Sequence, residues 1–286
     1  MDGLRAVREV MAARPTVEGA GVRLKRAFGS REAPQFDPFL MLDDFHSSEP
    51  ADYAAGFPWH PHRGMETITY MLAGEVEHQD SMGNRGVIGP GDVQWMTAGS
   101  GIIHQEMPRA SGGTELWGLQ LWANLPASRK MMAPRYQEIR AQQVPVVETD
   151  GGAEVRVICG ELAGTRGPVR DIVTDPGYLD VSIPAEGQFF HAMQDNHTVF
   201  AYVLEGAGLF SPEDSGEIGR EHAVLFGPGE AIRVTTSAGV RFVLVSGKPV
   251  AEPVAWGGPV VMNTQRELEE AFREYEEGTF IKLGAA

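Results

Sequence analysis

Most of this chain consists of short apolar stretches, rich in β-branched and aromatic residues, that end at glycine or proline turns. Turn signals at intervals of roughly eight to twelve residues are typical of short strands in a β-sandwich or β-barrel. The sequence contains 35 Gly and 19 Pro, which suit many turns between strands better than a few long helices. The pattern therefore predicts an all-β fold.

One strand-and-turn pattern occurs twice along the chain. Residues 70–74 read Tyr-Met-Leu-Ala-Gly, and residues 202–206 read Tyr-Val-Leu-Glu-Gly. In both copies a variable loop follows and leads to Gly-Pro-Gly and an acidic residue, at residues 89–92 and 227–230. Because the two elements keep their order and a similar spacing, we interpret them as two copies of one β-barrel.

The duplication predicts two domains, at residues 1–135 and 136–286. The boundary falls in a connector at residues 127–145 that contains two prolines. A chain of 286 residues with 42% hydrophobic content is long enough to form two cores. We assign a carboxyl-terminal helix to the second domain.

The pattern that predicts this helix begins with a capping box formed by Thr264 and Glu267. An apolar stripe at helical spacing follows and consists of Leu268, Ala271, Phe272 and Tyr275. Gly278 supplies a stop signal. We expect the stripe to pack against a barrel rather than to form a site.

The formal net charge of −15 narrows the range of partners. A nucleic-acid-binding protein needs a basic surface that displaces counterions from phosphates. The densest basic stretch, residues 23–26, is too short to supply one. The charge therefore argues against direct binding to nucleic acid, and against docking on an acidic membrane surface.

The sequence also predicts a cytoplasmic location. Cys159 is the only cysteine, so the chain cannot form an intramolecular disulfide, which agrees with a reducing compartment. The first residues lack the apolar core of a signal peptide. No apolar run approaches the roughly 20 residues that span a bilayer.

Two clusters of metal-ligand residues carry the candidate chemistry. Pro61 favours an extended His60, and residues two apart on a strand point to the same face. His60 and His62 should therefore project together, and His104 and Glu106 have the same spacing. Two such pairs in one barrel can converge on a single ion, and three imidazoles with one carboxylate suit iron, zinc, manganese or copper.

The identity of the carboxylate ligand is open on spacing alone. Glu66 is separated from His62 by an even number of residues, so a continued strand would place both side chains on one face. In the second copy of the repeat the positions of His60, His62 and Glu66 are held by Ala192, Gln194 and Thr198. We therefore expect the second barrel to hold no metal.

Longer strings around these clusters are similar to the two motifs of the cupin superfamily and closely resemble the pirin family of bicupins. The strings that carry the resemblance are residues 60–67, 70–74, 90–99 and 101–107, with 37–45 upstream and 118–122 downstream. The resemblance extends over essentially the whole chain. It implies two stacked, jelly-roll-like cupin β-barrels with one metal, usually iron, in the amino-terminal barrel.

The resemblance also bears on the ligands. It carries the ligand roles to His60, His62, His104 and Glu106. The general cupin pattern uses an acid at the position of Glu66, whereas the pirin pattern uses the acid two residues after the last histidine. We follow the pirin pattern. Fe(II) is the expected ion, and zinc, manganese, copper and nickel are compatible with the same ligands.

Two functions follow from the resemblance. Pirin-like proteins act as quercetin 2,3-dioxygenases, which open the central ring of a flavonol with dioxygen. In that case Glu106 or Glu66 would accept the substrate's proton, and the expected pocket walls are Phe57, Trp59, Met71, Trp95 and Met96. The alternative is a non-catalytic, redox-sensing regulator that acts through protein partners.

Overall fold

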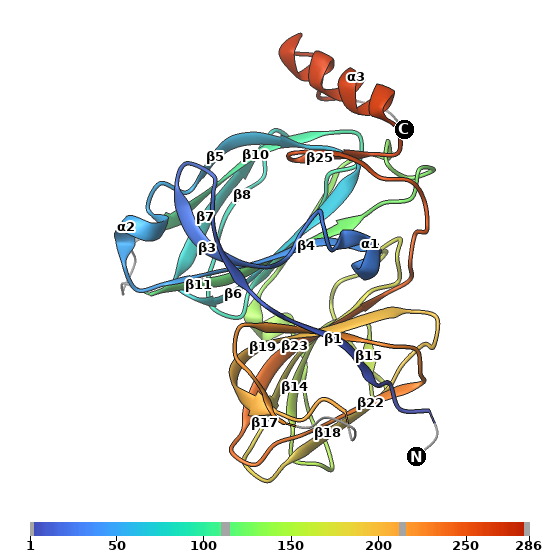
Figure 1. Cartoon of the computed structure of the whole chain (residues 1–286). Coiled ribbons are helices and arrows are strands. Elements are labelled where there is room, and N and C mark those ends of the chain that lie inside the picture. The colour runs from blue at the N-terminus through green and yellow to red at the C-terminus, as the bar shows by residue number, and fades with distance from the viewer. Residues whose placement is uncertain (1–2, 110–114, 212–215, 283–286) are drawn as a thin grey trace. The chain divides into compact units, whose positions relative to one another are not determined.

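The computed structural model describes residues 3–109, 115–211 and 216–282 (Figure 1). Over these ranges the chain is mostly β-strand, and no helix there is long and apolar enough to cross a membrane. The chain divides into two compact units, each described below by itself. The histidine unit, which holds His60, His62 and His104, comprises Pro15–Ala33, Phe39–Ala141 and Val250–Ala286. The companion unit comprises Met1–Arg14, Pro34–Pro38 and Gln142–Pro249.

This division differs at both chain ends from the two domains predicted at residues 1–135 and 136–286. The amino-terminal strand β1 (Val7–Ala12) pairs with β21 (His222–Phe226) in the companion unit. The carboxyl-terminal helix α3 (Gln265–Glu276) lies in the histidine unit, where Val260 forms a parallel bridge with Arg63. Backbone pairing with residues far away in the sequence therefore determines the unit to which each terminal segment belongs.

The histidine unit contains two antiparallel sheets. The seven-stranded sheet has the order β12 (Arg135–Ile139), β9 (Val93–Thr97), β6 (Met65–Ala73), β11 (Leu116–Asn124), β4 (Phe39–Ser47), β3 (Val22–Phe28) and β2 (Arg14–Glu18). The four-stranded sheet has the order β5 (Phe57–His62), β10 (Ile102–Arg109), β7 (Glu75–Asp80) and β8 (Arg85–Ile88). The smaller elements are α2 (Pro50–Tyr53) and the paired strands β24 (Ala255–Gly257) and β25 (Val260–Met262). The short helix α1 (Ala33–Phe36) belongs, apart from Ala33, to the companion unit.

The companion unit repeats this plan. Its main sheet has the order β1, β21, β19 (Thr198–Gly208), β23 (Val240–Gly247), β17 (Gly177–Ile183), β14 (Glu154–Cys159) and β13 (Val146–Glu148), with β20 (Ile218–Gly219) paired to β19. The smaller elements are β15 (Glu161–Leu162), β16 (Thr165–Arg166), β18 (Gln188–Ala192), β22 (Ala231–Thr235) and the 3₁₀ turn η1 (Ala141–Gln143).

Corresponding strands support the predicted duplication. β6 lies between β9 and β11, and β19 lies between β21 and β23 in the same chain order. Both copies have a glycine with positive φ at the matching position, 72° at Gly74 just after β6 and 68° at Gly206 within β19. A Cβ atom would lie 2.7 Å from a backbone oxygen at Gly74 and 2.1 Å from one at Gly206. Both positions therefore favour glycine, because of the positive φ and because of the close backbone approach.

The companion unit is filled with apolar side chains. Its core includes Val157, Phe189, Val199, Phe210, Ile232 and Phe242, all with exposed fractions of 1% or less. Of the residues at the ligand-equivalent positions, Ala192 and Gln194 are exposed and Thr198 is half-buried. Within the described residues, no group of potential ligands gathers in this unit.

The carboxyl-terminal helix confirms its sequence prediction. The side chain of Thr264 accepts a hydrogen bond from the Glu267 amide, and the Glu267 carboxylate accepts one from the Thr264 amide, which completes the capping box. Leu268 and Ala271 are buried against Val260 of β25. The helix thus fastens the carboxyl-terminal segment to the histidine unit.

The turn between β5 and β6 is anchored by a buried lysine. The Nζ atom of Lys130 donates hydrogen bonds to the carbonyls of Gly64 and Val261 and to Oδ1 of Asn124, at 2.8, 2.9 and 2.6 Å. Burial lowers the pKa of Lys130 to about 8. Gly64 has a φ of 77°, and a Cβ atom there would lie 2.0 Å from the Val261 carbonyl oxygen.

We expect Gly64→Ala to destabilise the protein strongly. Alanine adds both left-handed backbone strain of about 1–2 kcal/mol and a steric overlap that forces β25 away from the turn. The matched control is Gly83→Ala, because Gly83 has a φ of 88° but no atom within 4 Å of its Cβ position. Urea unfolding should give a clearly larger loss for Gly64→Ala, and equal losses would contradict this account of the turn.

Candidate metal centre

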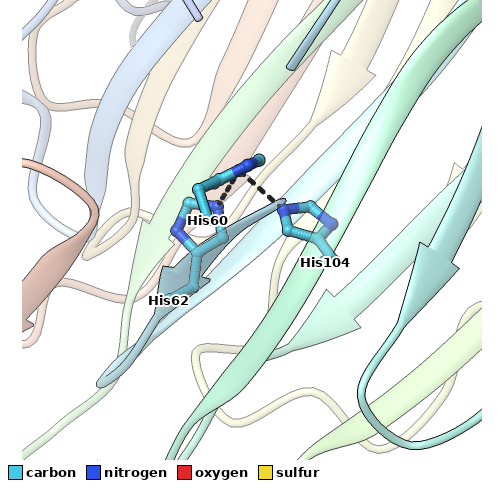
Figure 2. A group of neighbouring side chains, drawn as sticks. All are labelled: His60, His62 and His104. Carbon is cyan, nitrogen blue, oxygen red and sulfur yellow. Dashed lines mark hydrogen bonds between the residues drawn. The ribbon is translucent and has the colours of Figure 1, made fainter. Parts of the chain in front are cut away.

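Two hydrogen-bonded strands carry the three histidines of the candidate site. β5 supplies His60 and His62, β10 supplies His104, and His104 lies directly opposite His60 in the antiparallel pairing. Figure 2 shows the three rings turned toward one another. The extended geometry predicted around Pro61 is confirmed, since β5 runs through it to His62.

The Nε2 atoms of the three histidines converge. Nε2 of His60 lies 3.1 Å from Nε2 of His62 and 2.9 Å from Nε2 of His104 (Figure 2). All three ligand atoms lie within 4.8 Å of one another. Two nitrogens held roughly 2.1 Å from one ion at a right angle are roughly 3.0 Å apart. The spacing therefore fits His60 on a position adjacent to His62 and to His104 around one ion.

The other ring nitrogens of two histidines fix which nitrogen faces the cluster. Nδ1 of His60 lies 2.8 Å from the carbonyl oxygen of Pro58, and Nδ1 of His62 lies 3.1 Å from that of Pro259. A carbonyl accepts only, so each Nδ1 carries the proton and each Nε2 presents a lone pair. This is the tautomer that a metal-binding histidine needs.

Burial favours the uncharged form of two of these imidazoles. His62 and His104 are buried, with exposed fractions of 1% and 0%. Burial lowers the pKa of both well below the ordinary value, and repulsion from the neighbouring imidazoles adds to the shift. Neutral imidazole is the form that binds a metal ion, so the donor set, the burial and the spacing together fit a divalent metal site.

Glu106 lies next to the histidine cluster but does not join it. A bulge between His104 and Glu106 places the carboxylate opposite Phe57. Its Oε1 accepts a hydrogen bond from the Thr69 hydroxyl at 3.0 Å, and it lies outside the group of ligand atoms formed by the histidines. Its role as the fourth ligand stays a prediction.

Glu66 lies on the opposite face of the seven-stranded sheet, so the expected continued strand is wrong. β5 ends at His62, Gly64 makes a turn, and β6 begins at Met65 in the other sheet. The pairing of β6 with β9 is regular from Glu66 to Tyr70, so Glu66 and Thr69 point to opposite faces. Glu66 is buried there and accepts a hydrogen bond from Thr97.

A cavity of about 660 Å³ opens beside the cluster, and all of its lining residues belong to the histidine unit. His60, His62, Glu106 and Thr69 line it, together with apolar side chains. The largest of these are Met41, Phe45, Phe57, Trp59, Trp122 and Trp256. The volume lies in the range of roughly 300–1,000 Å³ that is usual for small-molecule sites.

Of the five residues predicted as pocket walls, two line the cavity and three do not. Phe57 and Trp59 line the cavity, and Trp59 is 49% exposed at its rim. Met71 packs in the apolar cluster whose members Phe45 and Phe57 line the cavity. Met96 packs against Ile102, and Trp95 lies on the Glu66 face of the sheet. These last three lie outside the lining of the cavity.

Sequence reasoning missed a charged group in the cavity wall. Nε and Nη2 of Arg26 donate to the two carboxylate oxygens of Asp43 at 2.7 and 2.8 Å, and Nη2 also contacts Glu18. Burial raises the pKa of Asp43 to about 6 despite the arginine. The available signal was the pair Asp43-Asp44 between apolar residues 39–42 and Phe45 in the strand Phe39–Ser47.

Comparison with known proteins settles the family. Residues 21–123 match the Pirin family, and residues 178–281 match the Pirin C-terminal cupin domain. A pirin-like protein of Caulobacter vibrioides is 44% identical over 278 residues, which cover 97% of this chain and 99% of that protein. The chain belongs to the pirin family.

Other pirin-family relatives cover the chain as fully. A pirin-like protein of Solanum lycopersicum is 44% identical over 276 residues, which cover 96% of this chain and 92% of that protein. A crystal structure of quercetin 2,3-dioxygenase from Acinetobacter baumannii has 31% identity and a TM-score of 0.89, and covers 98% of this chain and 100% of that chain. The pirin resemblance and the two-cupin fold predicted from the sequence are thus confirmed.

Proposed function

We propose that this pirin-family protein is a metal-dependent dioxygenase of the quercetin 2,3-dioxygenase type, acting on a flavonol with Fe(II). The observation that carries the proposal is the convergence of three histidine Nε2 atoms beside a small-molecule cavity. The activity of the Acinetobacter relative, which is 31% identical, supports the reaction class.

The proposed ligands are His60, His62, His104 and Glu106. Three imidazoles and one carboxylate leave two positions open on an octahedral ion. A divalent ion bound there would polarise a coordinated oxygen and lower the pKa of a coordinated hydroxyl. Iron suits these ligands, and the same set accepts zinc, manganese, copper or nickel.

The cavity wall supplies apolar surfaces for an aromatic substrate and a carboxylate that can accept a proton. Phe57, Trp122 and Trp256 offer flat apolar surfaces to an aromatic substrate and exclude water. Thr69 donates a hydrogen bond to Oε1 of Glu106 and holds the carboxylate at the cavity. In this proposal Glu106 accepts a proton from a bound hydroxyl.

The test is oxygen uptake by the Fe(II)-loaded protein in the presence of quercetin. We expect the protein to consume dioxygen and quercetin in equal amounts, and the chelator-treated protein to consume neither. Reloading the treated protein with Fe(II) should restore uptake. Background uptake by the loaded protein would contradict the proposal, and the capture of one dominant protein partner would then favour a regulatory role.

A further inference from the structure

The His104 imidazole lacks a hydrogen-bond partner at the ring nitrogen that faces away from the cluster, whereas His60 and His62 each have one. Nδ1 of His60 and of His62 faces a backbone carbonyl, whereas Nδ1 of His104 is buried and has no hydrogen-bond partner among the described residues. With Nε2 of His104 turned to the cluster, this Nδ1 carries the proton. A buried donor without an acceptor costs about 1–3 kcal/mol.

A second buried histidine lies beside it. β7 is the other neighbour of β10, and in their pairing His104 is opposite Asp80 while Glu106 is opposite His78. Directly opposed residues share a face of the sheet, so all four side chains point to the same side. The rings of His78 and His104 have centroids 5.3 Å apart, and His78 has an exposed fraction of 0%.

The surroundings of His78 assign its proton to Nε2. Its Nε2 lies 3.4 Å from Oδ2 of Asp80, and Asp80 also accepts hydrogen bonds from the amides of Met82 and Asn84 and from the Asn84 side chain. A carboxylate held by donors accepts only, so His78 donates through Nε2. Its Nδ1 is then an acceptor, and it too is buried without a partner among the described residues.

The two unpartnered nitrogens are complementary. Across the described residues, they are the only buried imidazole nitrogens that lack a hydrogen bond, and one is a donor where the other is an acceptor. Tyr136 stacks on His78 with centroids 5.0 Å apart and planes at 18°, which restricts rotation of the ring. The stacking therefore limits the orientations open to the His78 ring, whose neighbour is the His104 ring.

We propose that His78 and Asp80 are positioning residues for the metal centre, a role that rests on the proposed function. His78 accepts the hydrogen bond of the His104 Nδ1–H through one buried water, and Asp80 holds His78 in the tautomer that can do so. The link orients His104 and raises its basicity as a ligand. Outer partners of this kind are worth about 10–100-fold in metal affinity.

Co(II) binding to the full chain tests this role, measured by chelator competition and by the visible absorption of the bound ion. We expect His78→Phe, which preserves the stacking on Tyr136, to weaken Co(II) binding about 10–100-fold and to shift the absorption bands. The matched control is His46→Phe, because His46 also stacks on an aromatic ring, Trp117, and pairs with a carboxylate, Glu115. The control should bind Co(II) as the unsubstituted protein does.

A second pair of variants keeps the test decisive if phenylalanine disturbs the fold. The side-chain oxygen of asparagine lies near the position of Nδ1, whereas that of glutamine lies near Nε2, so His78→Asn should bind Co(II) more tightly than His78→Gln. Equal binding by that pair, or undiminished binding by a folded His78→Phe, overturns the positioning role and leaves the proposed function standing. An unsubstituted protein that binds no Co(II) overturns both.

Discussion

We expect His62→Ala to abolish metal binding, with a loss of affinity that exceeds the roughly 10–100-fold effect of an outer partner. The reason is the arrangement of the three Nε2 atoms, because removing one leaves the other two on separate strands without a third direct ligand. Metal content measured by mass spectrometry after dialysis should fall from one ion per chain to background.

The control for this loss is His197→Ala. His197 is a half-buried histidine of the companion unit, which we interpret as an ordinary polar residue. Its removal should leave the metal content unchanged. Full occupancy in His62→Ala, with the thermal stability of the apoprotein preserved, would contradict the assignment of the cluster as a metal site.

The second prediction with a large expected effect distinguishes the role of Glu106 from that of Glu66. We expect Glu106→Gln to lower kcat/KM for quercetin by about 10²–10⁴-fold, the usual contribution of a positioned general base. Glu106 lines the cavity on the face of Thr69, where a bound hydroxyl can reach it. Metal content should be measured alongside, because the loss of a ligand and the loss of a base both lower activity.

Glu66→Gln is the matched control, since it makes the same chemical change on the opposite face of the sheet. Burial raises the pKa of Glu66 even though Thr97 donates to it, and Glu66 lies outside the lining of the cavity. This variant should keep its activity. If Glu66→Gln lost more activity than Glu106→Gln, the general cupin pattern would describe this site better than the pirin pattern.

The sequence predicted those features that depend on local geometry. The shared direction of His60 and His62 follows from their two-residue spacing on one strand, and the positive φ of Gly74 follows from the turn after β6. The capping box of α3 is equally local. Each of these depends on residues within a few positions of one another, so one sequence suffices to read them.

Features that depend on contacts between distant segments could not be predicted in this way. The even spacing of Glu66 from His62 was uninformative because Gly64 ends one strand and starts another in a different sheet. Pro259 contacts His62 across 197 residues, and nothing in the pattern around Pro259 marks it as a partner. The cavity wall likewise combines strands from both sheets with the carboxyl-terminal segment.

The central claim is that His60, His62 and His104 hold one divalent ion. Anomalous diffraction from crystals of the metal-loaded protein, collected above and below the absorption edge of the metal, tests it most directly. The account predicts one anomalous peak, at bonding distance from the three Nε2 atoms. A map with no peak there, or with its only peak in the companion unit, would contradict it.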